Sequence, residues 1–332
     1  MIDNRKNFES RLKLLARAEK ELAAGNSGEA VCMMLSVEKE VLRSWADQMA
    51  QPPNYWESLN DSALLDAVFP IFAAETIAGS VNQIGSGVVV SIGEELFALT
   101  AAHVTDRALG DGVLFMPSKE GIVPMTGSLA YNPVSEHRPR LMDTGDMGYY
   151  HLSENWRTKL HPTIKPLSLG DLLLTDDLET GDLFTYVGYP WRLTKKRGGA
   201  QMTDRTTYTG HALSPDVYES LGLSRIVHVV IRMRLKKTYS TRHMSHKIAP
   251  HPQGISGGAV LAWPVTYSER LHSPKLKLAA IAHSFYAEKH CLVGTRIIPY
   301  MMAIVRNNPE LAIHFAGLEA CPEFCDFIEA VR

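Results

Sequence analysis

The sequence predicts a mainly β fold of the sandwich or barrel kind, with helices before and after it. From about residue 71, short apolar runs rich in branched and aromatic residues follow one another, and turn residues separate them. Clear turns stand at Gly110-Asp111-Gly112 and at Gly188-Tyr189-Pro190. Short apolar runs separated by turns favour antiparallel strands over alternating strand and helix units.

The predicted strands share a short apolar centre bounded by polar or turn residues. They cover residues 87–90, 96–99, 113–116, 147–152, 183–187, 226–233, 259–262, 278–282 and 292–297. We expect a short helix over residues 299–305 and a C-terminal helical tail over residues 307–332.

Residues 1–70 are expected to form an N-terminal helical extension. Apolar residues repeat at helical spacing over residues 8–22 and again over residues 31–49. Asn26-Ser27-Gly28 separates the two stretches, and Gln51-Pro52-Pro53 ends the second one. The helices would form a hairpin that either packs on the following domain or binds a regulatory protein partner.

The composition is that of an ordinary globular protein. Of its 332 residues, 45% are hydrophobic and 21% are charged, and the formal net charge at neutral pH is −2. A chain of this length can bury a core of normal size, so it does not require disulfides or a metal for stability. A nucleic-acid partner is not expected, because nucleic-acid-binding domains are usually basic.

Several observations favour a cytoplasmic protein without a cofactor. The first residues are charged and lack the apolar stretch of a secretory signal. The uncharged run 76–93 contains amides and glycines and is interpreted as sheet, so no membrane segment is expected. The four cysteines are too scattered for the disulfide framework of a secreted domain, and they suggest no metal site: Cys32, Cys291, Cys321 and Cys325.

Three segments carry the residue types of nucleophilic catalysis. Thr100-Ala101-Ala102-His103 places a histidine after two small residues at the end of an apolar strand, where its ring can lie against the backbone at a cleft edge. Asp146-Met147-Gly148-Tyr149 opens another strand with an acid that could accept the imidazole Nδ1–H. Gly254-Ile255-Ser256-Gly257-Gly258 exposes a serine hydroxyl on a tight turn. The backbone N–H groups of Gly254 and Ser256 could converge as an oxyanion hole.

Together these motifs resemble the three signatures of chymotrypsin-fold (trypsin-like) serine peptidases, and they follow one another in that family's order. Residues 85–90 also resemble the strand that leads to the family's histidine strand, and Gly181-Asp182 with residues 186–190 resembles the early second-barrel strands of its bacterial members. The resemblance covers residues 71–306. It implies two six-stranded antiparallel β-barrels and a serine endopeptidase that cleaves protein or peptide substrates. His103, Asp146 and Ser256 would act as the triad and form an acyl-enzyme.

Two alternatives stay open. Asp143 could be the acid, but we prefer Asp146 because the apolar strand begins directly after it; Asp106 is too near His103 in the sequence. A peptidase-fold binding or scaffold protein acting through the N-terminal helices is the alternative function. The presence of all three triad residues favours the enzyme. Because an uncontrolled cytoplasmic protease would be harmful, regulated activity or narrow specificity is expected.

The sequence departs from the digestive members of the family. Ile255 stands where they carry an acid that pairs with a newly cut N-terminus, so no such activation is expected. Pro250 stands where an acid would select Lys or Arg as the substrate's P1 residue, the one before the scissile bond. His283 could lie on the wall of the S1 pocket and favour Glu or Gln there, or it could lie outside the pocket. The S1 residues suggested by the resemblance are Pro250, His283, Ser284 and Phe285.

Overall fold

The structure is a computed structural model that describes residues 63–74, 81–108, 112–132, 145–176, 178, 182–197, 200–240, 245–249, 251–264 and 275–332. The predicted N-terminal helical hairpin lies outside the described residues and stays a prediction, as does any role of Asp143 or Pro250.

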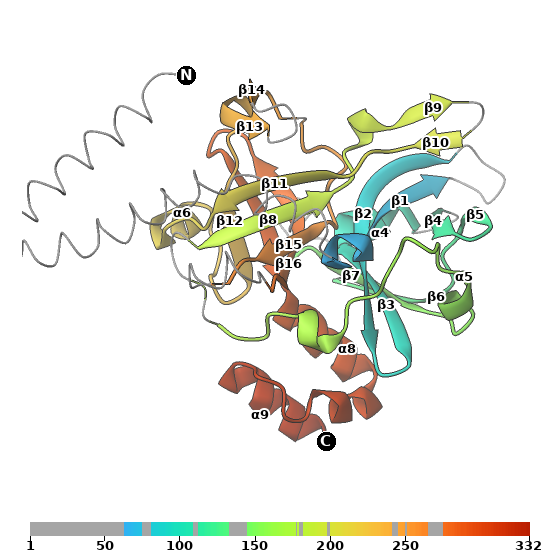
Figure 1. The fold of residues 1–332 in the computed structure, drawn as a ribbon. Helices are drawn as coiled ribbons and strands as arrows, with labels where there is room; N and C mark the ends of the chain where they lie inside the picture. Colours follow the sequence, from blue (N-terminus) through green and yellow to red (C-terminus); the bar gives the residue numbers. More distant parts are fainter. Residues whose placement is uncertain are drawn as a thin grey trace, which may run out of the picture.

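The first sheet is antiparallel, with strand order β5-β4-β1-β2-β3-β7-β6 (Figure 1). It holds seven strands where six were predicted, because β4 turns back at a tight hairpin and adds the short edge strand β5. The strands are β1 (Val68–Ala74), β2 (Asn82–Ile92), β3 (Glu95–Ala101), β4 (Val113–Ser118), β5 (Gly121–Pro124), β6 (Gly127–Tyr131) and β7 (Met147–Leu152).

The second sheet is also antiparallel and has six strands, in the order β11-β8-β15-β16-β17-β12. They are β8 (Leu183–Gly188), β11 (Thr206–His211), β12 (His228–Arg232), β15 (Ala259–Ala262), β16 (Lys277–Tyr286) and β17 (Cys291–Arg296). Two small hairpins pair β9 (Lys195–Arg197) with β10 (Ala200–Met202) and β13 (Thr238–Ser240) with β14 (Ser245–Lys247).

Most helices are short and connect strands. They are η1 (Ala63–Ala67), α4 (Ala102–Thr105), η2 (Asp106–Ala108), α5 (Trp156–Lys159), η4 (Leu169–Asp171), η5 (Trp191–Leu193), α6 (Pro215–Ser220) and η6 (Leu235–Lys237). The chain then ends in α8 (Ile297–Asn307), η7 (Pro309–Phe315) and α9 (Pro322–Val331). Of the helices in the described part of the chain, none is both long and apolar enough to cross a bilayer. The predicted mainly β architecture, with two antiparallel sheets followed by C-terminal helices, is confirmed.

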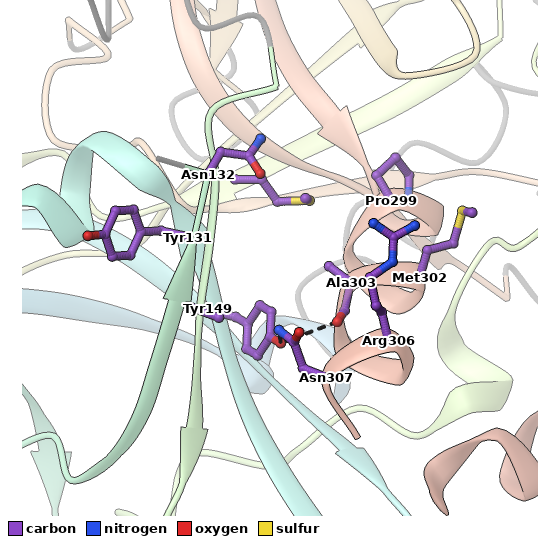
Figure 2. Close-up of a pocket in the computed structure, with 10 residues that line it drawn as sticks. Tyr131, Asn132, Tyr149, Pro299, Met302, Ala303, Arg306 and Asn307 are labelled. Carbon is purple, nitrogen blue, oxygen red and sulfur yellow. Dashed lines mark hydrogen bonds between the residues drawn. The ribbon is translucent and has the colours of Figure 1, made fainter. Parts of the chain in front are cut away.

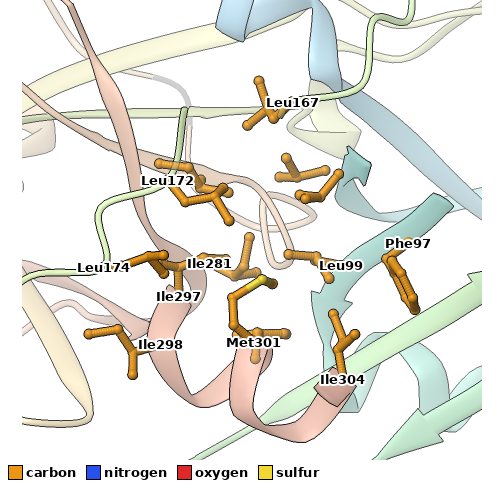
Figure 3. Close-up of a cluster of buried hydrophobic side chains, with 14 of the residues drawn as sticks. Phe97, Leu99, Leu167, Leu172, Leu174, Ile281, Ile297, Ile298, Met301 and Ile304 are labelled. Atoms are coloured by element: carbon orange, nitrogen blue, oxygen red, sulfur yellow. The ribbon is translucent and has the colours of Figure 1, made fainter. Parts of the chain in front are cut away.

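The largest apolar core joins both sheets to the C-terminal helices. Figure 3 shows α8 side chains such as Met301 and Ile304 beside Leu99 of β3 and Ile281 of β16. Because this core draws on both sheets, α8 fixes how they sit against each other. Each sheet also encloses its own cluster, around Trp156 in the first and around residues such as Tyr186 in the second.

A buried hydrogen bond ties α8 to the strand that leads toward His103. The hydroxyl of Tyr300 donates to the main-chain oxygen of Thr100 at 2.7 Å, and Tyr300 is fully buried. Since Thr100 stands three residues before His103, this bond fixes the end of β3 where the candidate site begins.

The C-terminal tail should be part of the folded core. Phe324 of α9 is 1% exposed and meets Phe315 edge to face, whereas Phe327 on the same helix is partly exposed. We predict that Phe324→Ala lowers the free energy of unfolding by about 3–5 kcal/mol, because it leaves a cavity in the shared core. Phe327→Ala should cost clearly less in the same urea unfolding experiment. Equal losses, or no loss for Phe324→Ala, would contradict the tail's place in the core.

Candidate active site

Strand pairing brings the predicted histidine and acid together. β3 and β7 pair so that Ala101 lies opposite Met147. His103 follows the end of β3 by two residues, and Asp146 immediately precedes β7. In an antiparallel pair the end of one strand meets the start of the other. The register therefore places two residues that are 43 apart in the sequence side by side.

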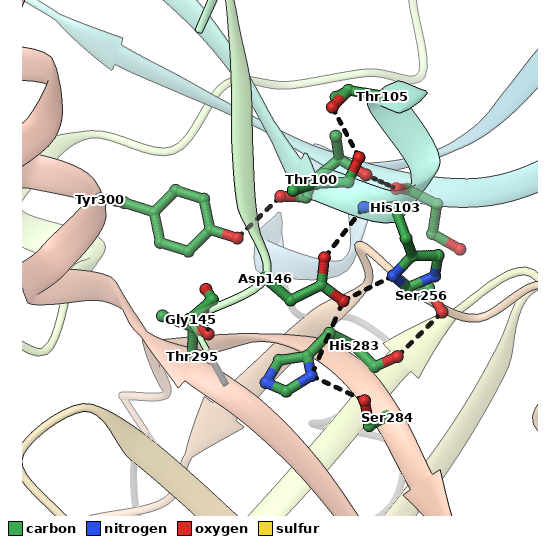
Figure 4. Close-up of polar contacts among 12 residues, drawn as sticks. Thr100, His103, Thr105, Gly145, Asp146, Ser256, His283, Ser284, Thr295 and Tyr300 are labelled. Carbon is green, nitrogen blue, oxygen red and sulfur yellow. Dashed lines mark hydrogen bonds and ion pairs between the residues drawn. The ribbon is translucent and has the colours of Figure 1, made fainter. Parts of the chain in front are cut away.

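Asp146 holds His103 by two hydrogen bonds. The main-chain N–H of His103 donates to Oδ1 at 2.9 Å, and the ring Nδ1 lies 2.6 Å from Oδ2 (Figure 4). His103 belongs to the single-turn helix α4, and its side chain is 36% exposed while that of Asp146 is 6% exposed. The carboxylate thus fixes both the backbone and the ring of a histidine whose side chain is partly open to solvent.

The Asp146 carboxylate is ionised in this setting. Burial by itself would raise its pKa, but the hydrogen bond from His103 and the charges of His103 and His283 outweigh burial and lower the pKa from its usual value. The hydroxyl of Thr295 on β17 donates to the main-chain oxygen of Gly145 at 2.8 Å. The second sheet therefore holds the backbone next to the acid.

The loop that carries Ser256 is fixed between the two sheets. Ser86 of β2, in the first sheet, donates its N–H to the Ser256 oxygen at 2.7 Å. Gly257 donates its N–H to the oxygen of Ala282 in β16, in the second sheet, also at 2.7 Å. Ile255 is buried within the apolar cluster of the second sheet, whereas Ser256 is only half-buried. The serine is thus held on a rigid turn with its side chain accessible.

Glycine is needed on both sides of this turn. Gly257 has φ +86°, and a Cβ there would come within 1.9 Å of the Ser86 main-chain oxygen and 2.1 Å of Thr100 Oγ1. Gly254 has φ +87°, and a Cβ would meet the backbone nitrogen of Trp191 at 2.8 Å. Both the backbone conformation and the close packing exclude larger residues.

Ser256 does not bond to His103 in this structure. Its hydroxyl donates instead to the main-chain oxygen of His283 at 3.2 Å, and no hydrogen bond joins it to His103, although both residues are described. His283 links the serine to the acid. Its main-chain oxygen accepts from the Ser256 hydroxyl, and its ring Nδ1 lies 3.9 Å from Oδ2 of Asp146, the residue that holds His103. The Ser256 hydroxyl is therefore directed to His283 in this structure.

Two backbone N–H groups beside the Ser256 side chain, those of Gly254 and Ser256, were predicted to form an oxyanion hole. The Gln253 carbonyl accepts from the Trp191 N–H at 3.2 Å, and the Ile255 carbonyl accepts from the Tyr186 hydroxyl at 2.9 Å. In a trans peptide the N–H points away from the C=O of the same unit. The N–H groups of Gly254 and Ser256 therefore point away from these partners, and neither meets an acceptor within the part of the chain that the structure describes.

The other residues predicted for the S1 pocket lie on β16. Ser284 and Phe285 are partly exposed, and the Phe285 ring meets that of His251 edge to face at 6.1 Å. The His283 side chain is 3% exposed and packs toward Asp146 rather than into an open pocket. This placement gives no support to a histidine that reads the P1 side chain, so the preference for Glu or Gln stays a prediction.

Asp106 and Asp146 take different positions relative to His103. Asp106 begins η2, the turn after α4, while the His103 ring bonds to Asp146.

The contact between His283 and Asp146 was missed by sequence reasoning. It follows from a bulge in β16, where the pairing with β17 shifts between Ala282 and Ser284. A bulge re-aims a side chain, and the sequence offered only the open choice between a His283 on the S1 wall and one outside the pocket.

A pocket of about 380 Å³ lies apart from these residues, between β6, β7 and α8 (Figure 2). The Tyr149 hydroxyl accepts from the Asn307 amide at 2.7 Å on its floor, and Arg306 gives it one positive charge. None of His103, Asp146 and Ser256 lines it.

Within the described residues, one cluster of side chains carries atoms of the kinds that bind metal ions. The ligand atoms of Asp176, Cys321 and Glu323 lie within 4.8 Å of one another. The guanidinium of Arg296 already pairs with Asp176 at 2.9 Å, and burial raises the pKa of the Cys321 thiol. A cation would compete with Arg296 for the Asp176 carboxylate, and Cys321 would have to lose its proton, because only the thiolate binds a metal. We assign no metal to this cluster.

The comparisons with known proteins are distant. No protein-family model matches the chain, and no curated protein matches it. A solved structure titled "Structure of GrC" aligns with 16% identity and a TM-score of 0.46, covering 74% of this chain and 96% of that one. The structure of neuropsin, a serine protease expressed in the limbic system of mouse brain, aligns with 15% identity and a TM-score of 0.47, covering 74% and 95%. At such identities and TM-scores the alignments carry no argument about what this chain does.

The ionised Asp146 should make stability depend on pH. Its pKa is lower in the folded chain than in the unfolded one, so its contribution is complete above about pH 4 and is lost as the pH falls through the lowered value. We predict that Asp146→Asn lowers the free energy of unfolding at pH 7 by about 1–3 kcal/mol. The difference from wild type should shrink in urea unfolding below about pH 4.

The matched control is Asp216→Asn, which changes an exposed acid on α6 and should stay within about 0.5 kcal/mol of wild type. A loss for Asp146→Asn that is the same at pH 3 and pH 7 would contradict the assigned charge.

Proposed function

We propose that this chain is a serine endopeptidase in which Ser256 is the nucleophile, His103 the general base and Asp146 the acid that orients the base. The observation that carries the proposal is the double hold of Asp146 on His103, at 2.9 Å to the backbone and 2.6 Å to the ring. That hold lies beside a half-buried serine on a glycine turn.

The hydrogen bonds assign a role to each nitrogen of His103. An ionised carboxylate only accepts, so Nδ1 carries the proton that faces Asp146. Nε2 is then the basic nitrogen of the ring. When the Ser256 hydroxyl rotates from the His283 oxygen toward Nε2, His103 can remove its proton as Oγ attacks the scissile carbonyl. Asp146 stabilises the imidazolium that results.

The negative oxygen of the tetrahedral intermediate would be received by the N–H groups of Gly254 and Ser256. The carbonyls of these two peptide units are bonded elsewhere, which supports N–H groups that are available to this oxygen. The proton on His103 then passes to the leaving amine, which departs and leaves an acyl group on Ser256. Water, activated by the same histidine, hydrolyses the ester and restores the enzyme.

Regulation belongs to the proposal as well. Ile255 is 4% exposed in an apolar cluster, so it offers no acid for a newly cut N-terminus. We infer that activation does not need a cleavage before the first sheet. A cytoplasmic peptidase of narrow specificity, acting on protein or peptide and open to a regulatory partner at its N-terminal helices, fits this inference.

Labelling with a fluorophosphonate tests the nucleophile. Such a probe reacts only with an activated serine, so the wild-type chain should carry one adduct, located on Ser256 by peptide mass spectrometry. Ser256→Ala should abolish the adduct, and His103→Ala should slow labelling strongly because the base is lost. Ser220→Ala, which removes an exposed serine of α6, serves as the matched control and should label like wild type.

No adduct in the wild type, or an adduct that survives Ser256→Ala, would contradict the proposal. In that case the alternative function, a binding or scaffold protein on a peptidase fold, would be the one to pursue.

A further inference from the structure

A second imidazole lies beside the Asp146 carboxylate. His283 Nδ1 is 3.9 Å from Oδ2, the same oxygen that His103 Nδ1 meets at 2.6 Å (Figure 4). A distance of 3.9 Å is too long for a hydrogen bond, so the interaction is electrostatic. Both side chains are almost fully buried, at 3% and 6% exposed, and water screens such a pair weakly.

The same residue also contacts the nucleophile. The main-chain oxygen of His283 accepts from the Ser256 hydroxyl at 3.2 Å, and the His283 ring is held by Ser284 Oγ at 2.9 Å from Nδ1. The bulge in β16 makes this double contact possible, because it turns the ring toward Asp146 while the backbone stays beside Ser256.

We propose that His283 is a positioning residue of this site, an inference that rests on the proposed function. Its ring steadies the Asp146 carboxylate and offsets part of its charge, and its main-chain oxygen holds the resting Ser256 hydroxyl. Asp146 stabilises the protonated form of His103, so a donor or cation on the same carboxylate weakens that stabilisation. His283 thereby tempers the hold of Asp146 on the protonated His103 ring.

The groups around His283 come from several elements. Asp146 and His103 face it from the start of β7 and from α4, and the ring of His228 on β12 meets its ring edge to face at 6.2 Å. Arg296 on β17 is directed to Asp176 at 2.9 Å. Asp146 is the carboxylate that His283 contacts, so the two imidazoles compete for it.

Two substitutions separate the ring's charge from its bulk. His283→Leu removes both nitrogens and keeps the side chain apolar and large. His283→Asn keeps a neutral donor near the Nδ1 position and cannot take up a proton. His228→Asn is the matched control, because it changes the neighbouring buried histidine, whose ring Nδ1 lies 2.9 Å from the Ser224 oxygen.

The titration of the His103 ring is followed by NMR in a Ser256→Ala background, and the acid limb of the kcat/KM profile is followed in chains that keep Ser256. With His283→Leu we expect both midpoints to move to higher pH by about half a unit or more, since a group that offsets Asp146 is gone. His283→Asn should move them less, and His228→Asn should leave them in place.

Unchanged midpoints in both His283 variants, with thermal unfolding showing that they are folded, would overturn the proposal. So would an equal shift in His228→Asn. The NMR titration needs no turnover, which keeps the two proposals apart. If the midpoint moves but no chain hydrolyses peptide or reacts with a fluorophosphonate, the peptidase function fails, while the positioning of Asp146 by His283 stands. If hydrolysis is normal and no midpoint moves, only the role of His283 fails.

Discussion

The two hydrogen bonds from His103 to the Asp146 carboxylate are the contact on which the rest of the candidate site depends. They exist because β3 and β7 pair in a register that brings Ala101 opposite Met147. A shift by one residue would reverse the faces of the strand and move the acid away from the ring. The contact also keeps Asp146 ionised despite its burial, because the favourable bonds outweigh the cost of removing the charge from water.

The remaining parts of the site are held between the two sheets. The Ser256 loop accepts a hydrogen bond from Ser86 in the first sheet and donates another to Ala282 in the second. Helix α8 fixes the sheets against each other through the shared core, and Tyr300 ties that helix to the strand end before His103. A substitution in the core between the sheets would therefore act on the site without touching any of its residues.

Much of the fold could be predicted because its central strands are short apolar runs between turns. β1 was missed because Pro70 stands in its middle, which is typical of edge or irregular strands, and β11 because its residues are mostly threonine and polar. The contact between His103 and Asp146 was predicted from order and resemblance. The position of His283 was not, because a bulge depends on pairing between distant strands and leaves little trace in one sequence.

The central claim is that Ser256 attacks a carbonyl with the help of His103. Burst kinetics with an activated nitrophenyl ester tests it most directly, because an acyl-enzyme that forms faster than it is hydrolysed releases one nitrophenol per active chain before steady state. We predict a stoichiometric burst in the wild type and none in Ser256→Ala. A burst of equal size in both chains, or steady release without a burst at the same rate in both, would contradict it.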